Sequence, residues 1–253
     1  MGGKEEDIGK WVYNTEAILG QGGFGAVYRG TDKKTGLPVA IKVVNQIQLQ
    51  KKNPKMYDNV LKEVDLQKKL KKTKSPHIVY IHGHLDDGDM LYVILELCDQ
   101  GSLQDEIDKR IENEKTFTTD EILKYLCQIF MSLKPLQDLQ IAHRDIKPDN
   151  YFVQNGILKL GDFGISTEQQ GGKFETMGCG TAPFMAPEMI EDDGCRSHKV
   201  DLWAAGVIGF YLNYLTMPWD GPMHMIAPKI VNDPLVFPEG KHIDPILKDL
   251  IIK

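Results

Sequence analysis

The sequence has few of the features that are typical of secreted, zinc-binding or membrane-spanning proteins. Its 4 cysteines are scattered, and none stands in a C-x-x-C pair: Cys98, Cys127, Cys179 and Cys195. This spacing argues against a disulfide framework and a zinc knot, and it favours a reducing compartment, the cytoplasm or the nucleus. The longest apolar stretch, residues 202–215, contains Asn213 and is shorter than the roughly 20 residues that span a bilayer. We therefore expect no membrane partner.

Basic residues do not outnumber acidic ones. Lys plus Arg is 30 and Asp plus Glu is 36, which gives a formal net charge of −6. Generic binding to a phosphate backbone needs an excess of positive charge, so we expect no nucleic-acid partner. Internal repeats and low-complexity tracts are also missing. With 42% hydrophobic and 26% charged residues, the composition is typical of a soluble globular protein. The length allows one large domain or two lobes.

Sequence periodicity divides the chain into a strand-rich first third and a helix-rich remainder. Strands are predicted at residues 15–19, 26–29, 39–44 and 91–97. A helix with an apolar face can begin at Asp58. Later, Thr118 and Glu121 form a capping box that opens a second helix, and Pro135 is expected to kink or end it. Residues 202–215 predict a helix that is buried at the centre of a helical lobe.

Three glycines near the N-terminus have a spacing that fits two kinds of phosphate-binding loop. Gly20, Gly22 and Gly25 match G-x-G-x-x-G, which occurs in dinucleotide folds and in hairpins that cover phosphates. A dinucleotide fold needs a helix directly after the glycines, whereas residues 26–29 are β-branched and aromatic and predict a returning strand. A hairpin is therefore favoured, and its backbone N–H groups could approach phosphate oxygens without obstruction by a Cβ.

A lysine stands on a strand that we expect to be half buried. Lys42 follows the apolar residues 39–41, and an ammonium group in such a place needs an anionic partner. Glu63 on the following helix and a bound phosphate could both serve. Taken alone, however, Lys42 is better interpreted as an ordinary surface lysine on an edge strand.

Two polar segments in the middle of the chain carry the most specific chemistry. Residues 143–150 place a carboxylate, cations and an amide at fixed offsets in one short loop, and residues 162–164 follow an apolar, strand-like run. The side-chain oxygens of Asn150 and Asp162 are ligands of the kind that Mg²⁺ takes when it also keeps phosphates and water. Asp145 is then left to accept a proton from a hydroxyl group.

In this order, the segments resemble the motif set of the eukaryotic protein kinase family over residues 11–253. The resemblance implies an α+β, bilobal fold. A small antiparallel β lobe with the family's C-helix would occupy residues 11–98, and a larger, mainly helical lobe residues 99–253, after a polar leader at residues 1–10. It also implies a shortened C-terminal end, which would leave Glu188 without its usual arginine partner.

The resemblance further implies ATP and Mg²⁺ as cofactors and Ser or Thr hydroxyls of proteins as acceptors. Asp145 would be the catalytic base, Lys147 would support the transferred phosphate, and Thr181 would brace both. Asn150 and Asp162 would hold the metal. The implied ATP-binding positions are Leu19, Gly20, Gly22, Gly25, Val27, Ala40, Lys42, Glu63, Leu95, Glu96, Cys98 and Phe152.

Two positions depart from the family's pattern. Thr176 is the best candidate for an activating phosphorylation, beside Ser166 and Thr167, although it lies one residue farther from Gly180 than the usual acceptor. Constitutive activity without phosphorylation is the alternative. Gln67 occupies a C-helix position that active kinases usually fill with an apolar residue. It indicates either a looser active arrangement or a C-helix that is controlled by a regulatory protein.

The interpretation that we favour is an active serine/threonine protein kinase, because every catalytic position holds the expected residue type. The alternative is a non-catalytic kinase-fold scaffold or a nucleotide-binding pseudokinase. An NAD-dependent oxidoreductase is disfavoured because no helix is predicted after the glycines. Within the Ser/Thr branch, the sequence Leu-Gly-Asp-Phe-Gly-Ile at residues 160–165 resembles the NIMA-related group.

Overall fold

The computed structural model describes residues 4–22, 25–52, 54–168, 180–191 and 197–252. The chain divides into two compact units. The first unit runs to residue 74 and includes residues 78–99, and the second takes residues 75–77 and the chain from residue 100 onward. Within the described residues, no helix combines the length and apolar character that crossing a membrane requires.

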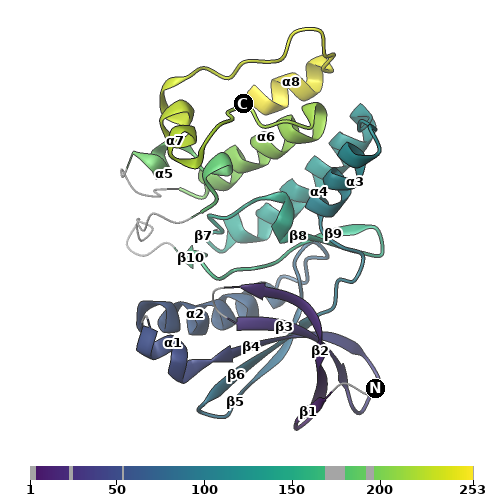
Figure 1. Ribbon diagram of the computed structural model, residues 1–253, viewed down its shortest axis with the longest axis vertical. Helices are drawn as coiled ribbons and strands as arrows, with labels where there is room; N and C mark the ends of the chain where they lie inside the picture. The colour runs from purple at the N-terminus through teal and green to yellow at the C-terminus, as the bar shows by residue number, and fades with distance from the viewer. Residues whose placement is uncertain (1–3, 23–24, 53, 169–179, 192–196, 253) are drawn as a thin grey trace. The chain divides into compact units, whose positions relative to one another are not determined.

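The first unit contains a six-stranded antiparallel sheet in the order β1-β2-β3-β4-β6-β5 (Figure 1). Its strands are β1 (Glu5–Ile8), β2 (Trp11–Gly22), β3 (Gly25–Asp32), β4 (Pro38–Asn45), β5 (Ile81–Asp86) and β6 (Met90–Glu96). The strands predicted at residues 15–19, 26–29, 39–44 and 91–97 lie in β2, β3, β4 and β6, the last ending one residue early. The glycine-rich segment is a β2–β3 hairpin in which Gly22 pairs with Gly25, so the prediction of a returning strand is confirmed.

The strand β1 lies within the residues expected to form a polar leader. Its four residues pair with β2, and the Oγ1 and backbone N–H of Thr15 both donate to the carbonyl of Lys4. Ile8 is buried in the cluster that covers one face of the sheet. The strand was not predicted because its sequence is polar. Pairing with β2 and one buried side chain, Ile8, stabilise it.

Two helices cover the other face of the sheet, α1 (Gln46–Lys52) and α2 (Pro54–Lys71) (Figure 1). The helix predicted from Asp58 therefore begins four residues earlier. Leu49, Val60 and Val64 from these helices pack against sheet residues such as Val44 and Val93. Because side chains alternate along a strand, Lys42 points to the same face as Val44, the face that α2 covers.

The second unit is mainly helical. Its helices are α3 (Leu103–Glu112), α4 (Thr119–Asp138), α5 (Pro187–Ile190), α6 (Lys199–Tyr214), α7 (Met223–Asn232) and α8 (Pro245–Ile252). Short elements complete it: β7 (Ile141–Ala142), η1 (Pro148–Asn150), β8 (Tyr151–Gln154), β9 (Ile157–Leu160), β10 (Thr167–Glu168) and η2 (Ala182–Phe184). The expected α+β fold class, with a small antiparallel unit and a larger helical one, is confirmed.

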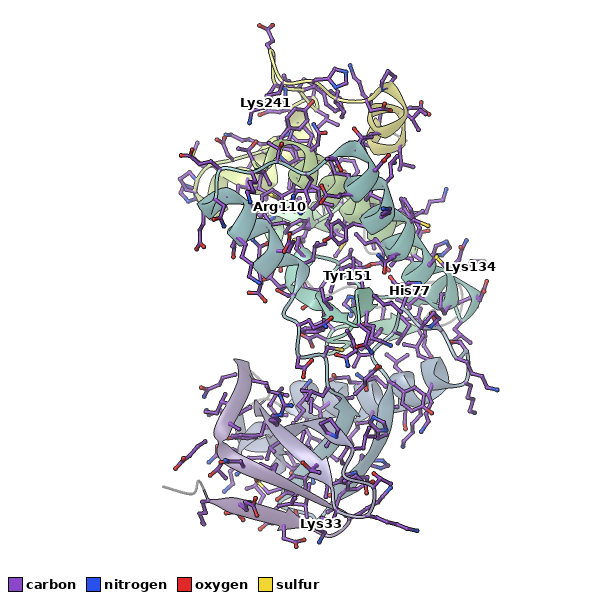
Figure 2. All side chains as sticks on the ribbon, turned by 90° about the vertical axis from the view of Figure 1, so that its right-hand side faces the viewer. Lys33, His77, Arg110, Lys134, Tyr151 and Lys241 are labelled. Carbon is purple, nitrogen blue, oxygen red and sulfur yellow. The ribbon has the colours of Figure 1, made fainter. Side chains whose placement is uncertain are left out.

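Helix α6 forms the centre of the second unit, beside α4 (Figure 1). Ten of its sixteen residues are buried, which confirms the buried helix predicted from residues 202–215. Tyr151 and His77 also belong to this unit (Figure 2). The buried hydroxyl of Tyr151 forms a hydrogen bond with the Oγ of Ser132, and the His77 Nδ1 forms one with the carbonyl of Leu158. These bonds fix β8 to α4 and residues 75–77 to β9.

Helix α4 has the predicted capping box and shows that Pro135 does not end the helix. The Thr118 Oγ1 accepts the backbone N–H of Glu121, and the Glu121 carboxylate accepts the backbone N–H of Thr118, which is the predicted capping box. Pro135 neither ends nor bounds the helix, which continues to Asp138. The packing of the buried Leu136 offsets the backbone hydrogen bond that a proline removes.

Candidate active site

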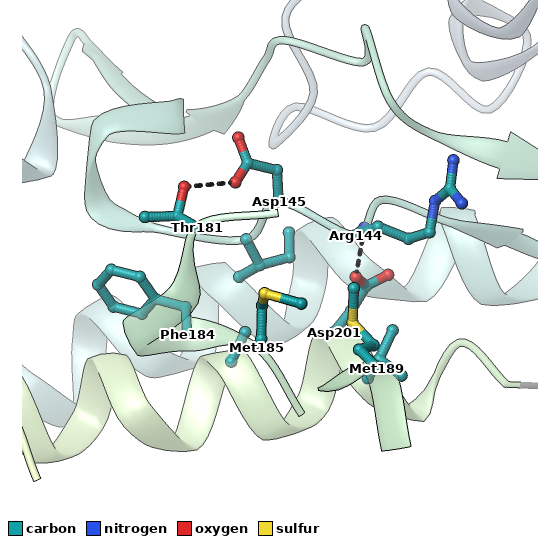
Figure 3. A pocket seen from close by; sticks show the side chains of 10 residues that line it. Arg144, Asp145, Thr181, Phe184, Met185, Met189 and Asp201 are labelled. Carbon is teal, nitrogen blue, oxygen red and sulfur yellow. Dashed lines mark hydrogen bonds between the residues drawn. The ribbon is translucent and has the colours of Figure 1, made fainter. Parts of the chain in front are cut away.

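A buried carboxylate at the start of α6 positions the loop that carries Asp145. Asp201 is only 2% exposed and accepts the backbone N–H groups of His143 at 2.8 Å and Arg144 at 2.9 Å (Figure 3). Arg144 has a φ of +68°, a conformation that a non-glycine residue holds only when its surroundings enforce it. Burial raises the pKa of Asp201, although the two N–H donors and His143 act in the opposite direction.

Four of the predicted site residues form one hydrogen-bonded group around Asp145. The Thr181 Oγ1 donates to the Asp145 Oδ1 at 2.8 Å (Figure 3). The Lys147 Nζ donates to the Thr181 Oγ1 at 2.8 Å and lies 2.9 Å from the Asp145 Oδ2. The Asn150 Nδ2 donates to both the backbone and the side chain of Asp145, at 2.7 and 3.0 Å. The Asp145 carboxylate is thus fixed from three sides.

This environment keeps Asp145 ionised at neutral pH. Its burial acts to raise the pKa, but the hydrogen bonds from Lys147 and Thr181, together with the charge of Lys147, outweigh burial and lower the pKa below its ordinary value. An ionised carboxylate accepts hydrogen bonds only. Asp145 is therefore suited to orient a hydroxyl group and to accept its proton.

His143 links this loop to the segment that carries Asp162. Its Nδ1 accepts the backbone N–H of Asp145 at 3.3 Å, and its Nε2 lies 3.1 Å from the carbonyl of Gly161. With Nδ1 as the acceptor, Nε2 is assigned as the donor to the Gly161 carbonyl. The ring also packs edge-on against Phe163, with 5.0 Å between ring centroids. His143 and Asp201 were not among the predicted site residues, although Asp201 is marked by its place just before the apolar run 202–215.

The proposed metal ligands fit a hard cation such as Mg²⁺. Asn150 is buried and uses its Nδ2 for Asp145, which leaves its Oδ1 as a ligand. Asp162 is exposed, with a φ of +55°. No group of three or more His, Cys, Asp or Glu side chains that could hold a metal occurs among the described residues. The amide oxygen of Asn150 and the carboxylate of Asp162 are the oxygen ligands that Mg²⁺ takes together with phosphates and water.

In the first unit, Lys42 and Glu63 form a buried ion pair. The Lys42 Nζ lies 2.9 and 2.7 Å from the two carboxylate oxygens of Glu63, and the side chains are 12% and 3% exposed. The surface-lysine alternative is therefore wrong. One turn farther along α2, Gln67 is also buried, and its Oε1 has no hydrogen-bond partner among the described residues.

The remaining predicted ATP-binding positions divide between the two units. The sheet pairs Gly20 with Val27, Val27 with Lys42, and Ala40 with Leu95. The positions in the first unit are Leu19, Gly20, Gly22, Gly25, Val27, Ala40, Leu95, Glu96 and Cys98. Phe152 belongs to the second unit, where it forms a bridge with Ser102. The first unit thus brings most of this set onto neighbouring strands.

The candidate phosphorylation positions lie in different settings. Thr176 falls outside the described residues. The Ser166 Oγ donates to the carbonyl of His143 at 3.3 Å, and Thr167 pairs with Ala142 in the two-stranded sheet of β7 and β10. The Arg144 guanidinium bonds to the carbonyl of Ile165.

Comparison with known proteins agrees with this geometry. The family model of the protein kinase domain matches residues 13–252. The chain is 33% identical to an Aurora kinase of Patiria pectinifera over 255 residues, 99% of this chain and 60% of the relative. It is also 33% identical to Aurora kinase B of Xenopus tropicalis over 239 residues, 93% of this chain and 62% of the relative.

A third relative is a much longer protein than this chain. The serine/threonine-protein kinase atg1 of Dictyostelium discoideum is 34% identical over 200 residues, 78% of this chain and 29% of the relative. The chain thus spans about three fifths of the length of the two Aurora relatives. The NIMA-related placement stays a prediction. The family match, together with these relatives, shows that the chain belongs to the eukaryotic serine/threonine protein kinase family.

Proposed function

We propose that the chain transfers the γ-phosphoryl group of ATP to Ser and Thr hydroxyls of protein substrates. The observation that carries this proposal is the hydrogen-bonded group of Asp145, Lys147 and Thr181. It combines an ionised acceptor for the hydroxyl proton with a cation beside it. The names of the relatives support the same reaction class.

In this reaction Asp145 would orient the substrate hydroxyl in line with the phosphorus atom and accept its proton as the new O–P bond forms. The Lys147 ammonium would neutralise charge on the transferred group, while Thr181 holds Lys147 and Asp145 in register. Phosphoryl transfer has a loose transition state, so positioning and charge neutralisation supply most of the catalysis.

The first unit would supply the nucleotide contacts. Glu63 holds the Lys42 ammonium at a fixed place, from which it would bind phosphate oxygens. The backbone of the β2–β3 hairpin would cover the phosphates. Asn150 and Asp162 would hold Mg²⁺, which when bound would supply positive charge to the ATP phosphates.

The buried, unpartnered Oε1 of Gln67 on α2 supports a second, narrower part of the proposal. An unsatisfied buried polar group costs free energy and destabilises the position of α2. A regulatory protein that binds α2 would stabilise that position. We place the reaction in the cytoplasm or the nucleus, as the cysteine spacing favours.

Transfer of labelled phosphate from ATP to a generic basic protein tests the proposal. We expect incorporation that requires Mg²⁺ and appears on phosphoserine and phosphothreonine after hydrolysis. Lys42→Ala and Asp162→Asn should abolish it while leaving thermal unfolding cooperative. If both variants keep near-normal transfer, the roles proposed for Lys42 and Asp162 are wrong. If the chain binds ATP without any transfer, the scaffold or pseudokinase alternative is correct.

A further inference from the structure

Two methionines share a small pocket with the proposed catalytic base. The pocket lies beside the loop that carries Asp145, and Thr181, Met185 and Met189 also line it (Figure 3). Both methionine side chains are only partly buried. Each residue therefore keeps some solvent-accessible surface beside the site.

The same two side chains pack against the backbone that precedes Thr181. A Cβ added to Gly180 would lie 3.3 Å from the Met185 Cγ and 3.7 Å from the Met189 Cε. On its other side it would lie 2.9 Å from the carbonyl oxygen of Arg144. The turn at Gly180 therefore fits closely between the two thioethers and the catalytic loop.

We propose that Met185 and Met189 are modification sites at which hydrogen peroxide oxidises the thioether to the sulfoxide and thereby slows phosphoryl transfer. This inference rests on the proposed function. A sulfur lone pair attacks one peroxide oxygen, the O–O bond breaks, and the second oxygen leaves as water with both protons. The sulfur loses two electrons and the peroxide gains them, so no further reactant is needed.

The chemistry of the sulfoxide explains the expected loss. Oxidation converts an apolar group into a strong hydrogen-bond acceptor, and a polar group that lacks a partner is costly to keep in a pocket. The sulfoxide oxygen would compete for the Thr181 hydroxyl or move out toward water. Either response shifts the Gly180–Thr181 turn and weakens the 2.8 Å bond from Thr181 to Asp145.

Because this bond acts on the transfer step, kcat should fall while the KM for ATP stays nearly constant. The nucleotide contacts proposed for Lys42 and the β2–β3 hairpin lie in the other unit. Loss of one hydrogen bond to a carboxylate corresponds to about a tenfold lower kcat.

The test treats the purified chain with hydrogen peroxide and follows kcat, the KM for ATP and methionine oxidation by peptide mass spectrometry. We expect the loss of kcat to parallel oxidation of Met185 and Met189. Methionine sulfoxide reductase should reverse the loss, whereas dithiothreitol, which reduces oxidised thiols, should not. A variant with Met185→Leu and Met189→Leu, which nearly conserves side-chain volume, should keep its own untreated kcat after peroxide.

Met131 provides the matched control, since it is 50% exposed on α4 and should oxidise readily. Met131→Leu should remain as sensitive to peroxide as the unmodified chain. Equal loss of kcat in the double Leu variant, or full oxidation of Met185 and Met189 without any loss, overturns the proposal.

The outcome also separates this inference from the proposed function. Absence of transfer before treatment refutes the proposed function and, with it, the expected effect on kcat. The methionine site is then judged by thermal unfolding, because oxidation should lower the Tm of the unmodified chain and not that of the double variant. An unchanged Tm would overturn it.

Discussion

The Thr181 hydroxyl donates a hydrogen bond of 2.8 Å to the Asp145 carboxylate and accepts one of 2.8 Å from Lys147. Thr181 lies 36 positions after Asp145 in the sequence. The proposed base is therefore positioned by a residue from outside its own loop.

Two replacements of Thr181 should distinguish the contribution of its hydroxyl to kcat from that of the rest of the side chain. Thr181→Ala removes the donor to Asp145 and the acceptor for Lys147, and we expect kcat to fall about tenfold or more. Thr181→Ser keeps the hydroxyl and should retain most of the activity. Steady-state kinetics of both variants checks this, and equal losses in the two would show that the hydroxyl does not act as described.

The pH dependence of kcat should move in a defined direction in Thr181→Ala. In the intact chain the pKa of Asp145 is lowered by Lys147 and Thr181 against the effect of burial, so activity is lost as the pH falls through that lowered pKa. Loss of one donor raises the pKa. The acid limb of the pH–kcat profile should then shift to higher pH, and a shift to lower pH would contradict the assignment of Asp145 as the ionised base.

The acid stability of the second unit should depend on Glu121. The hydrogen bond from the Arg110 guanidinium, helped by the backbone N–H of Thr118, lowers the pKa of Glu121 from 4.5 to about 2. Its contribution is present above the unfolded pKa and is lost as the pH falls through the folded value. Thermal unfolding between about pH 5 and pH 3 should therefore show a smaller drop in Tm for Glu121→Gln than for the unmodified chain.

Gln67→Leu should stabilise the chain. The amide oxygen is buried without a partner among the described residues, and an unsatisfied buried polar group costs about 1–3 kcal/mol. Leucine removes this cost and keeps a side chain of similar length on α2. A rise in Tm is expected, with Leu66→Ala as a control in the opposite direction, since Leu66 is buried beside it. No rise for Gln67→Leu would indicate that the Oε1 is satisfied in solution.

Two glycines of the β2–β3 hairpin should differ sharply in their tolerance of alanine. A Cβ on Gly25 would lie 2.0 Å from the carbonyl oxygen of Val43, and its φ is +144°, whereas a Cβ on Gly20 meets nothing within 4 Å. Gly25→Ala should lower the free energy of unfolding by about 2 kcal/mol or more, and Gly20→Ala by much less. Equal Tm values for the two variants would contradict the close packing of this hairpin.

Features that depend on neighbours in the sequence could be predicted. The capping box of Thr118 and Glu121 spans three residues, and the β2–β3 hairpin follows from glycines next to β-branched residues. The strand β1 was not predicted because its stability comes from pairing with β2. Pro135 lies inside α4 against its local preference, because the tertiary packing of Leu136 outweighs the lost backbone bond.

The candidate site also contains both features that depend on sequence neighbours and features that depend on tertiary contacts. The loop residues Asp145, Lys147 and Asn150 could be predicted from their spacing and family resemblance. Asp201 lies 58 positions from the backbone N–H of His143 that it accepts, and its place before the apolar run 202–215 does not indicate which groups it binds. The sequence alone allowed Glu63 or a bound phosphate as the partner of Lys42. The fold shows that Glu63 is one of them.

The central claim is that Asp145 accepts the hydroxyl proton during phosphoryl transfer. The most direct test compares single-turnover phosphorylation by Asp145→Asn with that by Asp149→Asn, an exposed carboxylate on the same loop. The account predicts a loss of about a hundredfold or more for Asp145→Asn and a rate near that of the unmodified chain for Asp149→Asn. Equal rates in the two variants would contradict it.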